Sequence, residues 1–183
     1  MVGTQRNGPT WAPIESTQHE GRPGWTTKQI IAILPLWAAT QPDIIVIHLG
    51  TNDVGQNHTL PELLTDMSSL LHNISIALPN ARVFLCTILY MINSINPQWV
   101  PMIEAYNTAL KTNFGSRSVS IIDVASATGL CNANDSPLHR FCAQCNSSGP
   151  CITDPTFYDR VHPTAAGYNV FAGVLAAALA AAL

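Results

Sequence analysis

The sequence predicts an α/β fold in which a mostly parallel sheet carries helices on both faces. Three apolar runs rich in β-branched residues, at residues 43–49, 81–90 and 118–124, have the length and composition of parallel strands covered on both faces. Helical segments lie between them, and this alternation is typical of a layered α/β domain. No repeat or linker divides the 183 residues, so we expect residues 1–183 to form one domain.

The ends of these segments are marked by capping and breaking residues. We interpret residues 1–4 as the end of a further strand. Thr26 can cap a helix that Pro35 breaks or kinks, and Thr59 to Glu62 forms a capping box before the next helix. Further helices are expected to begin at Asn96-Pro97 and after His162. The apolar positions expected to face the core are Ile30, Ile33, Leu34 and Trp37; Leu63, Met67, Leu70, Leu71 and Ile74; Trp99, Ile103, Tyr106 and Leu110; and Tyr168, Phe171, Val174 and Leu175.

The composition excludes several classes of protein. Apolar residues make up 47% of the chain and charged residues 10%, which excludes a disordered chain. The net charge is -3 and the basic residues are scattered, so we expect no nucleic-acid partner. The longest uncharged apolar run, residues 168–183, is shorter than the roughly 20 residues that span a bilayer. We therefore expect no membrane insertion, and nothing in the sequence calls for a cofactor.

The five cysteines divide into two groups. Cys86 lies inside an apolar run and is expected to be a buried free thiol. The others crowd into one polar stretch that two disulfides would hold, and three pairings are open. The alternative is a zinc site made by His139 with the last three of them. The four clustered cysteines are Cys131, Cys142, Cys145 and Cys151.

Glycosylation signals agree with the cysteine cluster. Asn-x-Ser/Thr sites occur at Asn57, Asn73, Asn134 and Asn146. Disulfides and such sites are features of secreted proteins. No signal peptide is visible in the chain, so we expect a secreted protein whose signal peptide lies outside these residues.

Three short segments carry residues suited to catalysis. Asn52 and Asp53 directly follow the strand at residues 43–49, and functional residues gather at such strand ends. Asp159 stands three residues before His162, close enough to orient its imidazole. Gly24 lies in the segment that leads into the helix capped by Thr26, and its backbone N–H could face a ligand there, because N–H groups at a helix start lack partners. Each segment taken alone is equally well explained as an ordinary turn.

Together and in this order, the segments resemble the SGNH hydrolases, also called GDSL esterases. Within them the chain is similar to family 3 of the carbohydrate esterases, which includes acetylxylan esterases. The resemblance implies a flavodoxin-like three-layer α/β/α sandwich and hydrolysis of acyl, commonly acetyl, esters of carbohydrate. A small-molecule or polysaccharide ester would be the substrate. The matching motifs are Val2-Gly3-Thr4, His19-Glu-Gly-Arg-Pro-Gly-Trp25, Gly50-Thr-Asn-Asp53, Tyr158-Asp-Arg-Val-His-Pro163 and Ala166-Gly167-Tyr168.

The resemblance also implies roles for individual residues. The Gly24 N–H and the Asn52 amide would stabilise the oxyanion, His162 would be the general base, and Asp159 would orient it. No metal is implied. We expect Asp53 to brace its turn, and the side chains that would line the substrate cleft are His19, Trp25 and Asp53.

One family block has no counterpart in these residues. The 183 residues contain no Gly-Asp-Ser segment, and neither Ser16 nor Thr4, the nearest hydroxyls, follows a strand-to-helix elbow. We therefore expect an N-terminally truncated domain whose first strand is missing or replaced, with hydrolase activity impaired or absent. An exposed sheet edge would then allow a homo-oligomer. The alternative is a non-catalytic pseudoenzyme that binds carbohydrate or another ligand.

Overall fold

The computed structural model describes residues 1–7, 12–13, 17–90, 98–116, 118–127, 162–163 and 165–182. The chain divides into two compact units. Unit 1 comprises Met1–Phe84 with Ser116–Ser120, and unit 2 comprises Leu85–Gly115 with Ile121–Leu183. The prediction of one domain stays a prediction.

A parallel sheet with the strand order β3-β4-β5 confirms the predicted α/β class. Its strands are β3 (Ile44–Ile47), β4 (Arg82–Cys86) and β5 (Val119–Ile122), one within each predicted apolar run. Backbone hydrogen bonds join neighbouring strands, with 2.9 Å from the Arg82 N–H to the Asp43 carbonyl and 3.1 Å from Val83 to Ser118. Because the strands are parallel, their carboxyl ends lie at one edge of the sheet.

The prediction of a strand end at residues 1–4 is wrong. The first strand is β1 (Gln5–Arg6), which pairs antiparallel with β2 (Gln18–His19) in a separate two-stranded sheet. The residues before β1 contact the end of β2 and the residue that follows it. The Thr4 N–H donates to the Glu20 carboxylate at 2.8 Å, and a Cβ on Gly3 would lie 2.2 Å from the His19 carbonyl oxygen.

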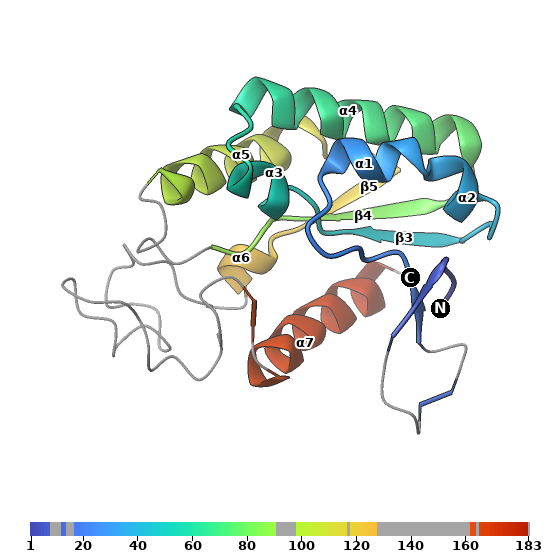
Figure 1. Ribbon diagram of the computed structural model, residues 1–183. Helices are drawn as coiled ribbons and strands as arrows, with labels where there is room; N and C mark the ends of the chain where they lie inside the picture. Colours follow the sequence, from blue (N-terminus) through green and yellow to red (C-terminus); the bar gives the residue numbers. More distant parts are fainter. Residues whose placement is uncertain are drawn as a thin grey trace. The chain divides into compact units, whose positions relative to one another are not determined.

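Capping residues set the helix boundaries of unit 1 as predicted. Capping boxes are present at Thr26 and Thr59, and the first helix ends before Pro35, which lies in the first turn of a new helix. In Figure 1, α1 and α2 lie alongside α4. The four helices are α1 (Thr27–Ala32), α2 (Leu34–Ala38), α3 (Thr51–Gly55) and α4 (Leu60–Ala77).

The core of unit 1 lies between these helices and one face of β3. Leu70 and Ile74 of α4 line a cavity together with Ile45 and Ile47 of β3. The opposite face of β3 bears Ile44 and Val46, which keep 37% and 41% of their surface exposed. Within unit 1 the described helices pack on the other face of β3, and the expectation that the strand is covered on both faces stays a prediction. Of the predicted stripe of α4, Leu63, Met67, Leu70 and Ile74 are buried as expected, whereas Leu71 is only half-buried.

Unit 2 contains one helix that matches its predicted burial and one that does not. Ile103, Tyr106 and Leu110 of α5 are fully buried, as expected. In α7, Tyr168 is 51% exposed, so its predicted inward position is wrong. Apolar residues, mostly alanine, occupy every face of α7. The spacing of its apolar residues therefore does not define an inward face. The helices are α5 (Trp99–Asn113), α6 (Val124–Ala127) and α7 (Ala165–Ala182), and α6 contacts α7.

The predicted free thiol is confirmed at Cys86, which is buried and unpaired. Burial raises its pKa to about 12, so the thiol is chemically quiet at neutral pH. The four clustered cysteines and His139 lie outside the described residues. Of the helices that the structure describes, none combines the length and apolar character needed to cross a membrane.

Candidate functional site

The Gly24 loop and the start of α3 are joined by two hydrogen bonds. Asn52 lies in the first turn of α3, which follows β3 through Gly50. Its side-chain amide donates to the Trp25 carbonyl at 2.9 Å, and the Gln56 amide donates to the Gly24 carbonyl at 3.0 Å. Two of the three predicted catalytic segments therefore meet within unit 1.

Two hydrogen-bond donors remain available at this junction. Gly24 has φ +75, a left-handed conformation that favours glycine, although a Cβ would meet no atom within 4 Å. Among the described residues no acceptor takes the Gly24 N–H or the second N–H of the Asn52 amide. Free, fixed donors of this kind are what stabilisation of an oxyanion requires.

Asp53 anchors α3 to the start of α1. The carboxylate is fully buried, and its two oxygens accept the Thr27 N–H at 3.0 and 3.1 Å and the Thr27 hydroxyl at 3.3 Å. Thr27 is the first residue of α1, where a negative charge also interacts favourably with the helix dipole. Burial nevertheless raises the pKa of Asp53 above its ordinary value, and the Thr27 hydrogen bonds offset only part of that effect. Through these buried hydrogen bonds Asp53 fixes α3 against α1, and with it the neighbouring residue Asn52.

A charged cluster fixes the loop that precedes Gly24. The Arg22 guanidinium donates to Glu20 at 2.9 Å and to the Thr4 hydroxyl at 2.8 Å, and it lies 4.7 Å from the centre of the Trp25 ring. Thr4 also hydrogen-bonds to Glu20 through its hydroxyl. Burial would raise the pKa of Glu20, but these hydrogen bonds outweigh it and lower the pKa. Glu20 is therefore a weak base, poorly suited to activating Thr4 as a nucleophile.

His19 lies in β2, next to a cavity of unit 1. Its Nδ1 accepts the Gly21 N–H at 3.0 Å, which fixes the ring. The residue lines a cavity of about 320 Å³ whose other walls are mainly apolar side chains of α1, α2, β3 and α4. Contact of His19 and Trp25 with a substrate stays a prediction.

The predicted acid–base pair is only partly described. His162 is exposed and precedes α7 in unit 2. Asp159 and Ser16 lie outside the described residues. The roles assigned to His162 and Asp159 therefore stay predictions.

Two residues that shape this junction were not singled out from the sequence. Gln56 had a usable signal, because it stands four positions after Asn52 and helix positions i and i+4 share a face. Thr27 had no such signal in the sequence, because its hydrogen bonds to Asp53 join residues 26 positions apart and depend on tertiary structure.

Comparison with known proteins agrees with this architecture. The model of the GDSL-like lipase/acylhydrolase family matches residues 3–170. A carbohydrate esterase family 3 structure from Talaromyces cellulolyticus superimposes with a TM-score of 0.73 at 24% identity, covering 97% of this chain and 79% of that one. A mutant acetyl esterase with an acetate ion gives 0.71 at 24% identity, covering 97% and 79%. A Clostridium thermocellum family 3 carbohydrate esterase gives 0.63 at 24%, covering 95% and 73%. No curated protein sequence matches the chain significantly.

Proposed function

Because the chain belongs to the GDSL-like lipase/acylhydrolase family, we propose that it acts on acyl, mainly acetyl, esters of carbohydrate. The carbohydrate part of this proposal is supported by its similarity to family 3 carbohydrate esterases and to an acetyl esterase.

The observation that carries the proposal is the junction of Gly24 and Asn52. Hydrogen bonds to the Trp25 and Gly24 carbonyls hold the two segments together, while one N–H of each candidate donor stays free among the described residues. Donors fixed before the reaction cost no reorganisation when negative charge develops on the carbonyl oxygen. We assign oxyanion stabilisation to these two groups.

The chemistry that we propose for this chain uses water. In these 183 residues taken by themselves, His162 would take a proton from a water molecule whose oxygen attacks the acyl carbon. The ester C–O bond then breaks, and His162 returns the proton to the leaving sugar oxygen. Asp159 would orient the imidazole. Enzymes without a triad member keep about 10³–10⁴ over the uncatalysed rate, so we expect weak activity.

The test is acetate release from an acetylated oligosaccharide by the purified chain and by His162→Ala. We expect a slow rate in the parent protein and a fall to background in the variant. Hydrolysis that proceeds equally in both would come from a contaminant and would contradict the proposal.

The second candidate is a binding protein without turnover, in which the fixed donors at the Gly24–Asn52 junction would hold a carbonyl oxygen of the ligand. Calorimetric titration with the same oligosaccharide separates the two. Binding without acetate release supports the pseudoenzyme, whereas binding with release that requires His162 supports the hydrolase.

Secretion and self-association also belong to this proposal. Asn57, in an Asn-x-Thr signal, is exposed, which supports glycosylation in a secretory pathway. In the described sheet β3 occupies one edge, which supports pairing with a second copy. Sedimentation analysis would measure the oligomeric state, and a monomer at micromolar concentration would contradict the second idea.

A further inference from the structure

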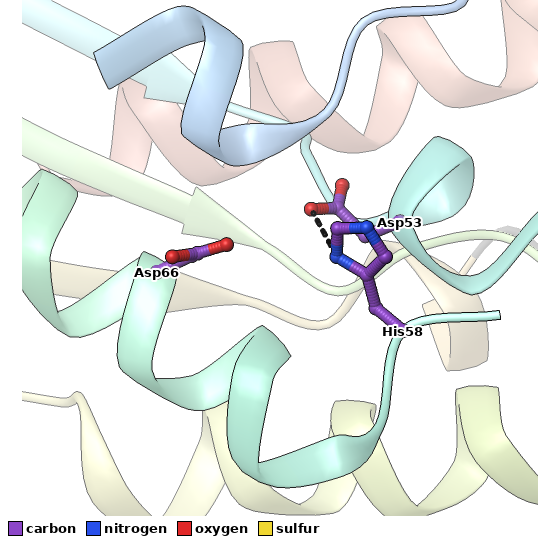
Figure 2. A group of neighbouring side chains, drawn as sticks. All are labelled: Asp53, His58 and Asp66. Atoms are coloured by element: carbon purple, nitrogen blue, oxygen red, sulfur yellow. Dashed lines mark ion pairs between the residues drawn. The ribbon is translucent and has the colours of Figure 1, made fainter. Parts of the chain in front are cut away.

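A second group of polar side chains lies in unit 1, on the α4 side of α3. Asp53 belongs to α3, His58 to the loop that follows it, and Asp66 to the second turn of α4. One ligand-type atom from each lies within 4.8 Å of the other two. Figure 2 shows the Asp66 carboxylate pointing toward the paired Asp53 and His58 side chains.

Two of the three side chains lack hydrogen-bond partners among the described residues. His58 Nδ1 is buried and unbonded, since it lies 3.7 Å from the nearest Asp53 oxygen, beyond hydrogen-bonding distance. The Asp66 carboxylate likewise accepts no hydrogen bond from the residues that the structure describes. Buried polar atoms in folded proteins normally have hydrogen-bond partners, and the closest partner of this Nδ1 is the Asp53 carboxylate in an ion pair at 3.7 Å, which leaves room for a third group between them.

The surroundings favour a cation as that group. His58 and Asp66 line a groove of about 700 Å³ that also exposes Glu62 and Lys28. Glu62 is already occupied, because its carboxylate accepts the Thr59 N–H and hydroxyl, both at 2.7 Å. Among the described residues Lys28 forms no ion pair with either aspartate. Two carboxylates therefore face one imidazole, and among the described residues His58 itself is the partner that lies within ion-pair distance of Asp53.

We propose that Asp53, His58 and Asp66 form a binding site for one divalent transition-metal ion, with Zn²⁺ the best match. Imidazole nitrogen suits zinc and its neighbours, whereas Ca²⁺ and Mg²⁺ prefer all-oxygen sites. Three protein ligands leave a fourth position for water or an anion in tetrahedral coordination. This site is separate from the proposed oxyanion donors and does not depend on ester hydrolysis.

The spacing agrees with such an ion after a small adjustment. Two ligands bound to tetrahedral zinc at about 2.0–2.1 Å lie about 3.4 Å apart. The Asp53–His58 separation of 3.7 Å is close to this value. Rotation of the Asp66 side chain, which no hydrogen bond to a described residue restrains, would bring in the third ligand.

The test is calorimetric titration of the full chain with Zn²⁺ and, in parallel, visible absorption on titration with Co²⁺. We expect one ion per chain at this site. Asp66→Asn and His58→Gln should each weaken its affinity at least tenfold, because even groups that only support metal ligands change affinity by 10–100-fold. Circular dichroism would confirm that each variant is folded, and the two variants serve as independent checks.

Glu62→Gln is the matched control. It removes a carboxylate from the same groove and the same helix, and glutamine can keep the capping box. This variant should bind zinc as the parent does. Binding that survives both Asp66→Asn and His58→Gln would locate the ion elsewhere, for example at the cysteines, and would overturn the proposal. So would the absence of any binding by the parent chain.

Discussion

Asp53 and Asp123 occupy similar places in the chain but have opposite electrostatic behaviour. Each follows a strand of the parallel sheet and accepts backbone N–H groups at a helix start: Thr27 for Asp53, Ser126 for Asp123. The Asp53 side chain is completely buried, whereas that of Asp123 is 32% exposed and pairs with Lys111 at 2.9 Å.

The pKa values of the two carboxyl groups shift in opposite directions. Burial raises the pKa of Asp53. Burial would also raise that of Asp123, but hydrogen bonds from Lys111, Ser126 and Thr87 outweigh it and lower the pKa. The direction of the pKa shift of a carboxyl group at a strand end therefore depends on how deeply it is buried and on whether a cation pairs with it. Asp53 has no lysine or arginine partner among the described residues, and its ion pair with His58 at 3.7 Å does not offset the effect of burial on its pKa.

The largest effect is expected from Asp53→Ala. The change leaves the buried Thr27 N–H and hydroxyl without an acceptor, and losing hydrogen bonds to a buried charged group costs about 3 kcal/mol. Urea denaturation would measure the free energy of unfolding. A loss of stability smaller than that of Asp123→Ala would contradict the claim that the buried carboxylate contributes more to stability.

Asp123→Ala should cost less, about 1.5 kcal/mol. Water can reach this partly exposed position and replace some of the hydrogen bonds to Ser126 and Lys111. The buried Thr87 hydroxyl, which donates to Asp123 at 3.0 Å, accounts for the remaining cost. The same denaturation experiment measures it, and a loss near zero would show that the Thr87 bond contributes nothing.

The pH dependence should differ in sign between the two sites. The lowered pKa of Asp123 gives stability that is present above the unfolded value of about 3.9 and is lost as pH falls through the folded pKa. The raised pKa of Asp53 does the reverse, so its contribution declines as pH rises from the unfolded value through the folded one. Relative to the parent, Asp123→Asn should thus be most destabilised at neutral pH, and Asp53→Asn at acidic pH. The free energy of unfolding of each variant and of the parent would be measured at pH 3.5 and pH 7. If the loss of stability changes with pH in the same direction for both variants, this assignment is wrong.

The smallest effect is expected from Lys111→Met. This lysine is 41% exposed, and such surface ion pairs contribute less than about 1 kcal/mol. The loss of stability should shrink further in 1 M salt, because screening weakens the pair in the parent protein. A loss larger than that of Asp123→Ala would mean that Lys111 acts through its aliphatic stem.

Local sequence signals predicted most of the elements. The capping box at Thr59 and the break at Pro35 were confirmed because each depends on residues close in sequence. The stripe of α4 was predicted because polar residues separate its apolar positions clearly. The same reasoning was wrong for Tyr168, since α7 is apolar all round and its spacing distinguishes no face.

Long-range contacts account for what the sequence did not predict. The Asp53–Thr27 bonds and the Asn52–Trp25 bond link residues 26 and 27 positions apart, and no local pattern records them. Asn52 and Gly24 were identified from their positions in the sequence and given roles by the family resemblance, but the hydrogen bonds that join their segments depend on the tertiary structure. His58 and Asp66 lie in an ordinary-looking loop and helix, so only their spatial grouping with Asp53 distinguishes them.

Acetate release by Asn52→Ala, set beside Gln56→Ala, is the most direct measure of the proposed oxyanion site. Both variants lose one amide that ties α3 to the Gly24 loop, but only the first loses a free donor. A rate lower by 10²–10³ in Asn52→Ala, with a change below tenfold in Gln56→Ala, is the predicted result. Equal rates in the two variants would show that the Asn52 amide is structural and would contradict the account.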